Sequence, residues 1–96
     1  MNDLSKTDEE QLLVLQEAFE KFQERNKKYK DLWKKGGWLD SAHHIRSKSE
    51  RIVNLLSTGA TLEEAELHIE DAVDLINYAA FFIRNVREAC QATATD

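Results

Sequence analysis

Carboxylates and an amide recur on one side of a segment in the last third of the chain. Asp71 and Asp74 are three residues apart, and Asn77 and Tyr78 follow them. Carboxylates at this spacing can hold Mg²⁺, which proteins usually bind through one or two carboxylates together with water and substrate phosphates. The spacing alone is weakly specific, because any acidic helix contains such pairs.

Three basic residues, His44, Lys48 and Arg51, follow one another at steps of four and three residues. On a helix they form one row. Such a row can bind phosphate, with Arg51 offering a planar fork of donors and Lys48 a point charge. The alternative is that these side chains are solvated or form salt bridges with the acidic segment downstream.

A third candidate set, Asn26, Tyr29 and Trp33, combines an amide with two aromatic rings. Aromatic rings stack on nucleobases, and an amide can read base edges, so this set is typical of a nucleotide pocket. Alternatively, Asn26 is the single polar member of an apolar heptad seam and sets the register of packed helices.

Three expected helices carry these residues. The first should run over residues 8–35, from a capping box at Thr7–Glu10 to a stop before Gly36 and Gly37. Its seam has alternating three- and four-residue steps and consists of Leu12, Leu15, Phe19, Phe22, Asn26, Tyr29 and Trp33.

The second helix should begin with Asp40 or Ser41 as its N-cap and end at Gly59. A capping box at Thr61–Glu64 opens the third helix, which should run to about Cys90. Short connections between three helices predict an antiparallel array in which the first and third helices are long.

Composition agrees with an all-α fold. The chain has 96 residues, no Pro, three Gly and 32% charged residues, which predicts one domain over residues 1–96 with an ordered core at about 8–90.

The net charge of −5 argues against general nucleic-acid binding. No apolar run approaches the ~18 residues of a membrane span. Cys90 is the only cysteine and cannot form an intramolecular disulfide, which fits a cytoplasmic location.

The third helix is apolar on two sides. Its main seam consists of Ile69, Ala72, Ile76, Ala79, Ile83, Val86 and Cys90, and the opposite side carries Leu75, Tyr78, Phe81 and Phe82. A helix of this kind needs two packing partners. We therefore expect a homo-oligomer, at least a dimer through the third helix, with the second set of residues at the subunit interface.

The combined pattern resembles a known family. It comprises Asn26-x-x-Tyr29-x-x-x-Trp33, Asp40, Lys48-x-x-Arg51-Ile52 and Asp71-x-x-Asp74-x-x-Asn77-Tyr78. Over residues 19–87 the chain resembles the nucleotide modification associated domain family of phages and bacteria, which looks like a branch of the MazG-like all-α nucleotide pyrophosphatases. The resemblance implies a MazG-like helical fold and a nucleotide ligand.

The chain departs from the MazG-like pattern in one respect. By analogy, such enzymes hold Mg²⁺ with a Glu-Glu-x-x-Glu motif and a later Glu-x-x-Asp motif. Asp71 and Asp74 match the later motif, but residues 43–50 offer one acid and several cations where the first is expected. The resemblance therefore implies a nucleotide binder more readily than a hydrolase.

Three functions remain open. The favoured one is a small, oligomeric, phage-type protein that sequesters a nucleotide, such as a defence signal, without a metal. Its ligand-binding residues would be Asn26, Tyr29, Trp33, His44, Lys48, Arg51, Asp74, Asn77 and Tyr78. The first alternative is a Mg²⁺-dependent nucleotide hydrolase with Asp71 and Asp74 as metal ligands. The second is a structural or protein-binding helical module.

Overall fold

The computed structural model describes residues 4–94, and this part of the chain is helical almost throughout, with no strand. The expected all-α class is confirmed. The α-helices are α1 (Lys6–Tyr29), α2 (Gly37–Val53), α3 (Leu62–Leu67) and α4 (Ile69–Ala94). Two short 3₁₀ helices, η1 (Leu32–Lys34) and η2 (Asn54–Ser57), follow α1 and α2.

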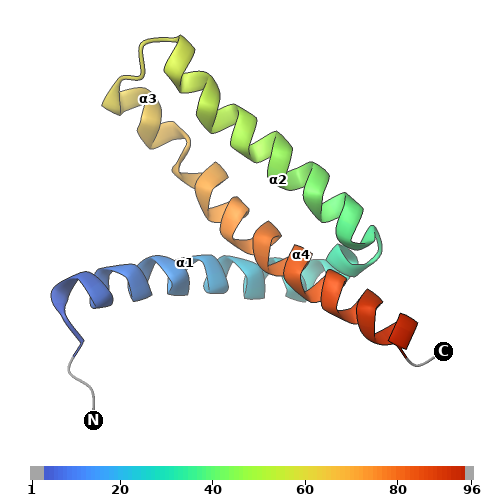
Figure 1. The fold of residues 1–96 in the computed structure, drawn as a ribbon. Coiled ribbons are helices and arrows are strands. Elements are labelled where there is room, and N and C mark those ends of the chain that lie inside the picture. Colours follow the sequence, from blue (N-terminus) through green and yellow to red (C-terminus); the bar gives the residue numbers. More distant parts are fainter. Residues whose placement is uncertain (1–3, 95–96) are drawn as a thin grey trace.

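Helices α2 and α4 form an antiparallel hairpin, and α1 crosses α4 instead of lying along it (Figure 1). The expected antiparallel array is therefore correct for α2 and α4 but not for α1. At the crossing, Ala18 is 1% exposed and Asn77 Nδ2 of α4 donates to the Ala18 carbonyl at 2.9 Å. A small residue permits this close approach, and the amide bond fixes where α1 meets α4.

Helix α1 begins earlier than expected, at Lys6. Ser5 is the N-cap: its Oγ accepts from the Asp8 amide at 3.0 Å, while Asp8 Oδ2 accepts from the Ser5 amide at 3.1 Å. The capping box is thus Ser5 with Asp8 and not Thr7 with Glu10, because Asp8 can reach back to the amide three residues earlier.

Helix α1 also ends earlier, at Tyr29. Lys30 and Asp31 adopt left-handed backbone conformations with φ of 42° and 59°. The Asn26 carbonyl accepts from the Lys30 amide at 2.8 Å and Asn26 Oδ1 accepts from the Asp31 amide at 3.0 Å. These bonds satisfy groups at the helix end and stabilise a turn that is otherwise unfavourable for non-glycine residues. The turn precedes Gly36, so the glycines open α2 instead of closing α1.

Helix α2 begins at Gly37, before the expected caps Asp40 and Ser41. Ser41 is 2% exposed; its Oγ donates to the Gly37 carbonyl at 3.3 Å and accepts from Asn85 Nδ2 of α4 at 3.2 Å. Ser41 therefore links the two hairpin helices and does not cap one of them. Helix α2 gives way to η2 after Val53, and Gly59, with a φ of 95°, lies in the following turn and does not end α2 itself.

The expected third helix is broken in two. Thr61 caps it as predicted, with its Oγ1 accepting from the Glu64 amide at 3.2 Å. Helix α3 then ends at Leu67, because His68 leaves helical geometry (φ −103°, ψ 8°), and α4 begins at Ile69. His68 Nδ1 lies 2.8 Å from Asp71 Oδ2 in the first turn of α4.

The two sides of α4 do not pack as expected. Phe81 stacks on Trp33 at 4.7 Å and contacts Phe22 at 5.6 Å between ring centroids, and Phe82 meets Trp38 edge-on at 6.4 Å. The side expected at a subunit interface therefore packs within the chain, and that prediction is wrong. The expected inner seam faces outward instead, with Ile69 53% and Ile83 46% exposed.

The molecule is open for its size. A compact monomer of 11.1 kDa exposes about 5,650 Å², whereas this chain exposes 7744 Å². Its radius of gyration is 16.2 Å, against about 12.5 Å for a compact domain of this length. Much of the exposed apolar surface lies on the half of α1 that extends past the hairpin (Figure 1), at Leu12, Leu13, Val14, Leu15 and Phe19.

Candidate functional site

A pocket of about 520 Å³ lies where the second half of α1, η1, the start of α2 and the middle of α4 meet. This volume is within the usual range for small-molecule sites. Of the nine residues expected to bind a ligand, seven line this pocket: Asn26, Tyr29, Trp33, His44, Asp74, Asn77 and Tyr78. The structure thus brings together residues from three parts of the sequence.

Aromatic rings form much of the pocket wall. Trp33 is stacked on Phe81, and the guanidinium of Arg84 lies 4.3 Å from the Trp33 ring centroid. The Trp33 indole Nε1 is buried without a hydrogen-bond partner among residues 4–94. A buried N–H donor of this kind costs free energy until an acceptor satisfies it.

The opposite wall pairs α2 with α4. The rings of His44 and Tyr78 are stacked, with centroids 4.4 Å apart and planes within 6° of parallel. His44 Nε2 also lies 3.5 Å from Asp40 Oδ2, one turn earlier in α2. A flat ring surface therefore adjoins a carboxylate on this side.

Both asparagines of the pocket make structural hydrogen bonds that the sequence did not predict. Asn26 caps the turn that carries Leu32 and Trp33 into the pocket, which is neither of the two roles considered for it. Asn77 holds α4 against α1 through the Ala18 carbonyl. Each residue therefore shapes the pocket, whatever contact it makes with a ligand.

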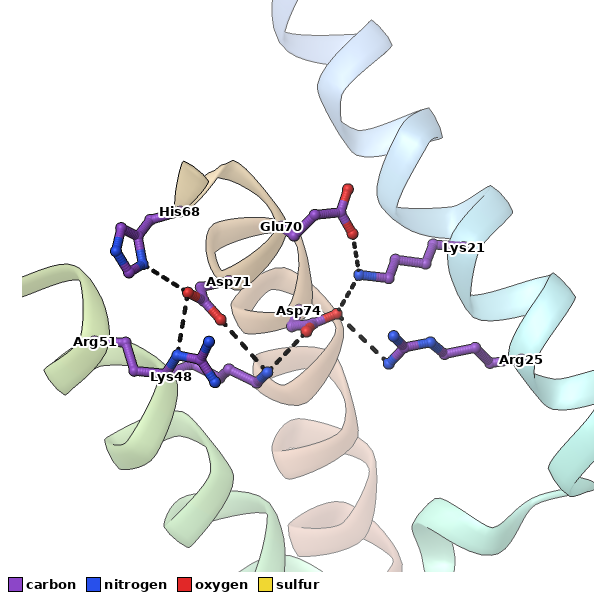
Figure 2. A network of polar contacts seen from close by, with 8 residues as sticks. All are labelled: Lys21, Arg25, Lys48, Arg51, His68, Glu70, Asp71 and Asp74. Atoms are coloured by element: carbon purple, nitrogen blue, oxygen red, sulfur yellow. Dashed lines mark hydrogen bonds and ion pairs between the residues drawn. The ribbon is translucent and has the colours of Figure 1, made fainter. Parts of the chain in front are cut away.

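A network of charged residues adjoins the pocket, and two of its members, Arg25 and Asp74, also line it. Figure 2 shows this network. Asp74, whose side chain is 8% exposed, accepts from Lys21 Nζ of α1 at 2.7 Å and from Lys48 Nζ of α2 at 3.0 Å. The Arg25 guanidinium lies further away, at 3.7 Å. One carboxylate on α4 thus binds cations from both of its neighbouring helices.

Asp71 forms the other half of the network (Figure 2). Its carboxylate lies 2.8 Å from His68 Nδ1, 3.3 Å from Arg51 Nε and 3.5 Å from Lys48 Nζ. Lys48 and Arg51 therefore pair with the acidic side of α4, which is the alternative considered for the basic row, whereas His44 pairs with Asp40 of its own helix. Lys48 and Arg51 do not line the 520 Å³ pocket.

These contacts keep the network charged. The hydrogen bond with His68 is the largest cause that holds the pKa of Asp71 below its usual range, and Arg51 and Lys48 add to it against burial. Burial alone would raise the pKa of Asp74, but hydrogen bonds from Lys21 and Lys48 outweigh it and the pKa is lowered. Burial would likewise lower the pKa of Lys21, but Asp74 and Glu70 raise it overall.

The carboxylates expected as metal ligands are engaged with cations. Within residues 4–94, no group of three or more His, Cys, Asp or Glu residues is arranged to hold a metal ion. Glu50, which could have joined Asp71 and Asp74, bonds Arg46 at 2.8 Å. Mg²⁺ would have to displace ammonium or guanidinium groups from Asp71 and Asp74.

Sequence reasoning missed two charged residues that line the pocket, Arg25 and Asp40. Arg25 lies four residues before Tyr29 and hence on the same helical face, a spacing that could have identified it. Asp40 was expected only as a candidate N-cap of the second helix and as part of the family-like pattern, not as a residue that binds a ligand.

No family model, curated protein or solved structure matches this chain. Within the described residues, no helix is long and apolar enough to cross a membrane.

Proposed function

We propose that this protein binds a nucleotide in the pocket between α1, η1, α2 and α4. The observation that carries the proposal is the combination of aromatic walls with a cation in one pocket: Tyr29, Trp33 and Arg25 all line it. Exposed rings stack on bases of any kind, and a guanidinium binds phosphate through paired hydrogen bonds. Tyr29 is 52% exposed, so its ring is accessible to a ligand.

The protein holds its ligand without Mg²⁺ and without hydrolysing it. Asp71 and Asp74 each accept from at least two basic side chains, and this arrangement favours binding through cations over metal-dependent turnover. In a hydrolase of the MazG-like type these carboxylates would bind metal, and the metal would supply the nucleophile. Sequestration is thus favoured over catalysis.

The protein acts as a homo-oligomer. The chain exposes roughly 2,000 Å² more than a compact monomer of its mass, and a standard interface buries about 800 Å² per partner. The outward side of α4 and the first half of α1 carry the exposed apolar residues, including Ile83 and Leu13. Because these residues do not line the pocket, assembly and ligand binding use different surfaces.

Isothermal titration with a panel of mononucleotides and cyclic nucleotides, with and without EDTA, tests the binding proposal. We expect binding that EDTA leaves unchanged, and intact ligand after denaturation and chromatography. Tyr29→Ala should weaken affinity by about 5- to 150-fold, the effect of losing one base–aromatic stack.

Trp38→Ala is the matched control, because Trp38 is 43% exposed and lies outside the pocket lining. Equal losses in the two variants would contradict the proposed pocket. Binding of no nucleotide at millimolar concentration would contradict the function itself. Mg²⁺-dependent appearance of product would establish the hydrolase instead.

A further inference from the structure

Two charged side chains of opposite sign line the pocket and are about half exposed. The Arg25 side chain of α1 is 56% exposed and the Asp40 side chain of α2 is 51% exposed. Asp74 also lines the pocket, but its side chain is 8% exposed and already binds Lys21 and Lys48. A ligand therefore meets one cation and one carboxylate from different helices.

Gly36 makes room for the Asp40 side chain. Its backbone (φ −80°, ψ −13°) is one that any residue adopts, so conformational freedom does not explain the glycine. A Cβ at position 36 would lie 2.3 Å from the Asp40 Cβ and 2.4 Å from its Cγ. Only glycine leaves this space, so Asp40 is held against the backbone on one side and faces His44, 3.5 Å away, on the other.

Arg25 can turn to a ligand at little cost to the network. Its guanidinium is 3.7 Å from Asp74 Oδ1, whereas Lys21 and Lys48 hold the same carboxylate at 2.7 and 3.0 Å. Asp74 would keep two close cationic partners if Arg25 moved to a phosphate. Arg25 is therefore the cation best placed to bind an anionic group in the pocket.

The chemistry of Asp40 determines which group of a ligand it can bind while Arg25 binds the phosphate. An ionised carboxylate only accepts hydrogen bonds, and its two oxygens suit two adjacent N–H donors. Guanine presents such a pair, N1–H and the 2-amino group, on its Watson–Crick edge. Adenine and cytosine place an acceptor beside their amino group, and uracil and thymine flank their single N–H with carbonyls, so each would set an acceptor against the carboxylate.

We propose that the pocket prefers guanine nucleotides, with Asp40 accepting from the Watson–Crick edge of the base and Arg25 binding the phosphate. This inference rests on the proposed function, because it specifies the nucleotide that the same pocket holds. The aromatic walls stack on the base but do not discriminate, since every base has a ring face. Selectivity comes from Asp40.

Titration with GMP, IMP, XMP and AMP tests the assignment. IMP lacks the 2-amino group, and XMP carries a carbonyl in its place. The wild-type protein should bind GMP most tightly, with IMP intermediate, and should prefer GMP over AMP by about 5- to 150-fold, the range for a bidentate base contact.

Asp40→Asn should reverse the order between GMP and XMP. An asparagine offers one acceptor and one donor, which match N1–H and the 2-carbonyl of XMP. Gly36→Ala, which moves the Asp40 side chain without removing it, should reduce the preference for GMP while phosphate-dependent binding persists. Should the Asp40 variant fail to fold, the wild-type order of GMP, IMP and AMP decides the question.

Equal affinity for all four nucleotides would overturn the inference and leave the proposed function standing. An unchanged GMP preference in Asp40→Asn would overturn it in the same way. Failure of every nucleotide to bind would overturn both.

Discussion

Replacing Asp74 with asparagine tests how the three long helices are held together. The carboxylate lies on α4, accepts from Lys21 of α1 and from Lys48 of α2, and is 8% exposed. Asparagine preserves the shape of the side chain but removes its charge. The ammonium groups of two lysines, whose side chains are 18% and 20% exposed, would then face a neutral amide.

The cost of this change follows from burial. Removing one partner of a buried ion pair destabilises a protein by about 3–5 kcal/mol, and partial exposure of the lysines places Asp74→Asn near the lower end, about 3 kcal/mol. Glu70→Gln is the matched control. It removes a carboxylate that binds the same Lys21 but is 73% exposed, and exposed pairs contribute at most about 1 kcal/mol.

Urea unfolding at one fixed protein concentration measures the difference, and the concentration must be fixed because oligomers unfold in a concentration-dependent way. A gap of about 2 kcal/mol and a slope of about 1–3 kcal/mol per molar urea predict midpoints that differ by about 1 M. Equal midpoints for the two variants would refute the role assigned to Asp74.

The pH dependence provides a second check on the same variant. The folded-state pKa of Asp74 is lowered. The contribution of Asp74 to the free energy of unfolding is therefore present above its unfolded-state pKa of about 3.9, and it is lost as the pH falls through the folded-state pKa. The wild type should therefore lose stability below about pH 4, more steeply than Asp74→Asn. The raised pKa of Lys21 acts in the opposite sense and matters only above about pH 10.4. Identical acid profiles would contradict this reasoning.

Two further predictions concern the outer side of α4 and the end of α1. Ile83→Lys should shift the mass in light scattering toward that of the 11.1 kDa chain, while the circular dichroism spectrum stays helical. Phe81→Ala, on the inner side of α4, should instead cost about 3 kcal/mol in stability. An oligomer of unchanged mass in Ile83→Lys would exclude this interface. Asn26→Leu should lower the melting temperature by roughly 4–8 °C through loss of about 1 kcal/mol of capping, and a higher melting temperature would show that Asn26 is only a register device.

The positions of the candidate residues were largely predictable from spacing. Asn26 and Tyr29 lie on one face of α1 wherever that helix ends, and Asp74, Asn77 and Tyr78 share a face of α4. The ends of the helices were less predictable. Lys30 is an unusual residue for a left-handed conformation. The Asn26 side chain that stabilises this turn is indistinguishable in the sequence from a core asparagine.

The sidedness of α4 was not predictable from hydrophobicity, because both of its sides are apolar. The charged residues determine which side of α4 faces the other helices. Asp71 and Asp74 lie on the same side as Tyr78, and their cationic partners lie on α1 and α2. Had the basic positions 21, 48 and 51 been matched to the acidic positions 71 and 74, the inner side would have followed from charge complementarity. The outer seam would then have been recognised as unpartnered.

The polar character of the α1–α4 crossing explains why a pocket exists at all. If the apolar seam of α1 packed along α4 over its full length, side chains such as Tyr29 would fill the space between the helices. Instead, α1 is held at the crossing by the Ala18 carbonyl and by Lys21. The second half of α1 then diverges enough to leave about 520 Å³, and the first half keeps its apolar residues exposed. One crossing, held by a hydrogen bond and an ion pair, thus accounts for both the pocket and the exposed apolar surface on the first half of α1.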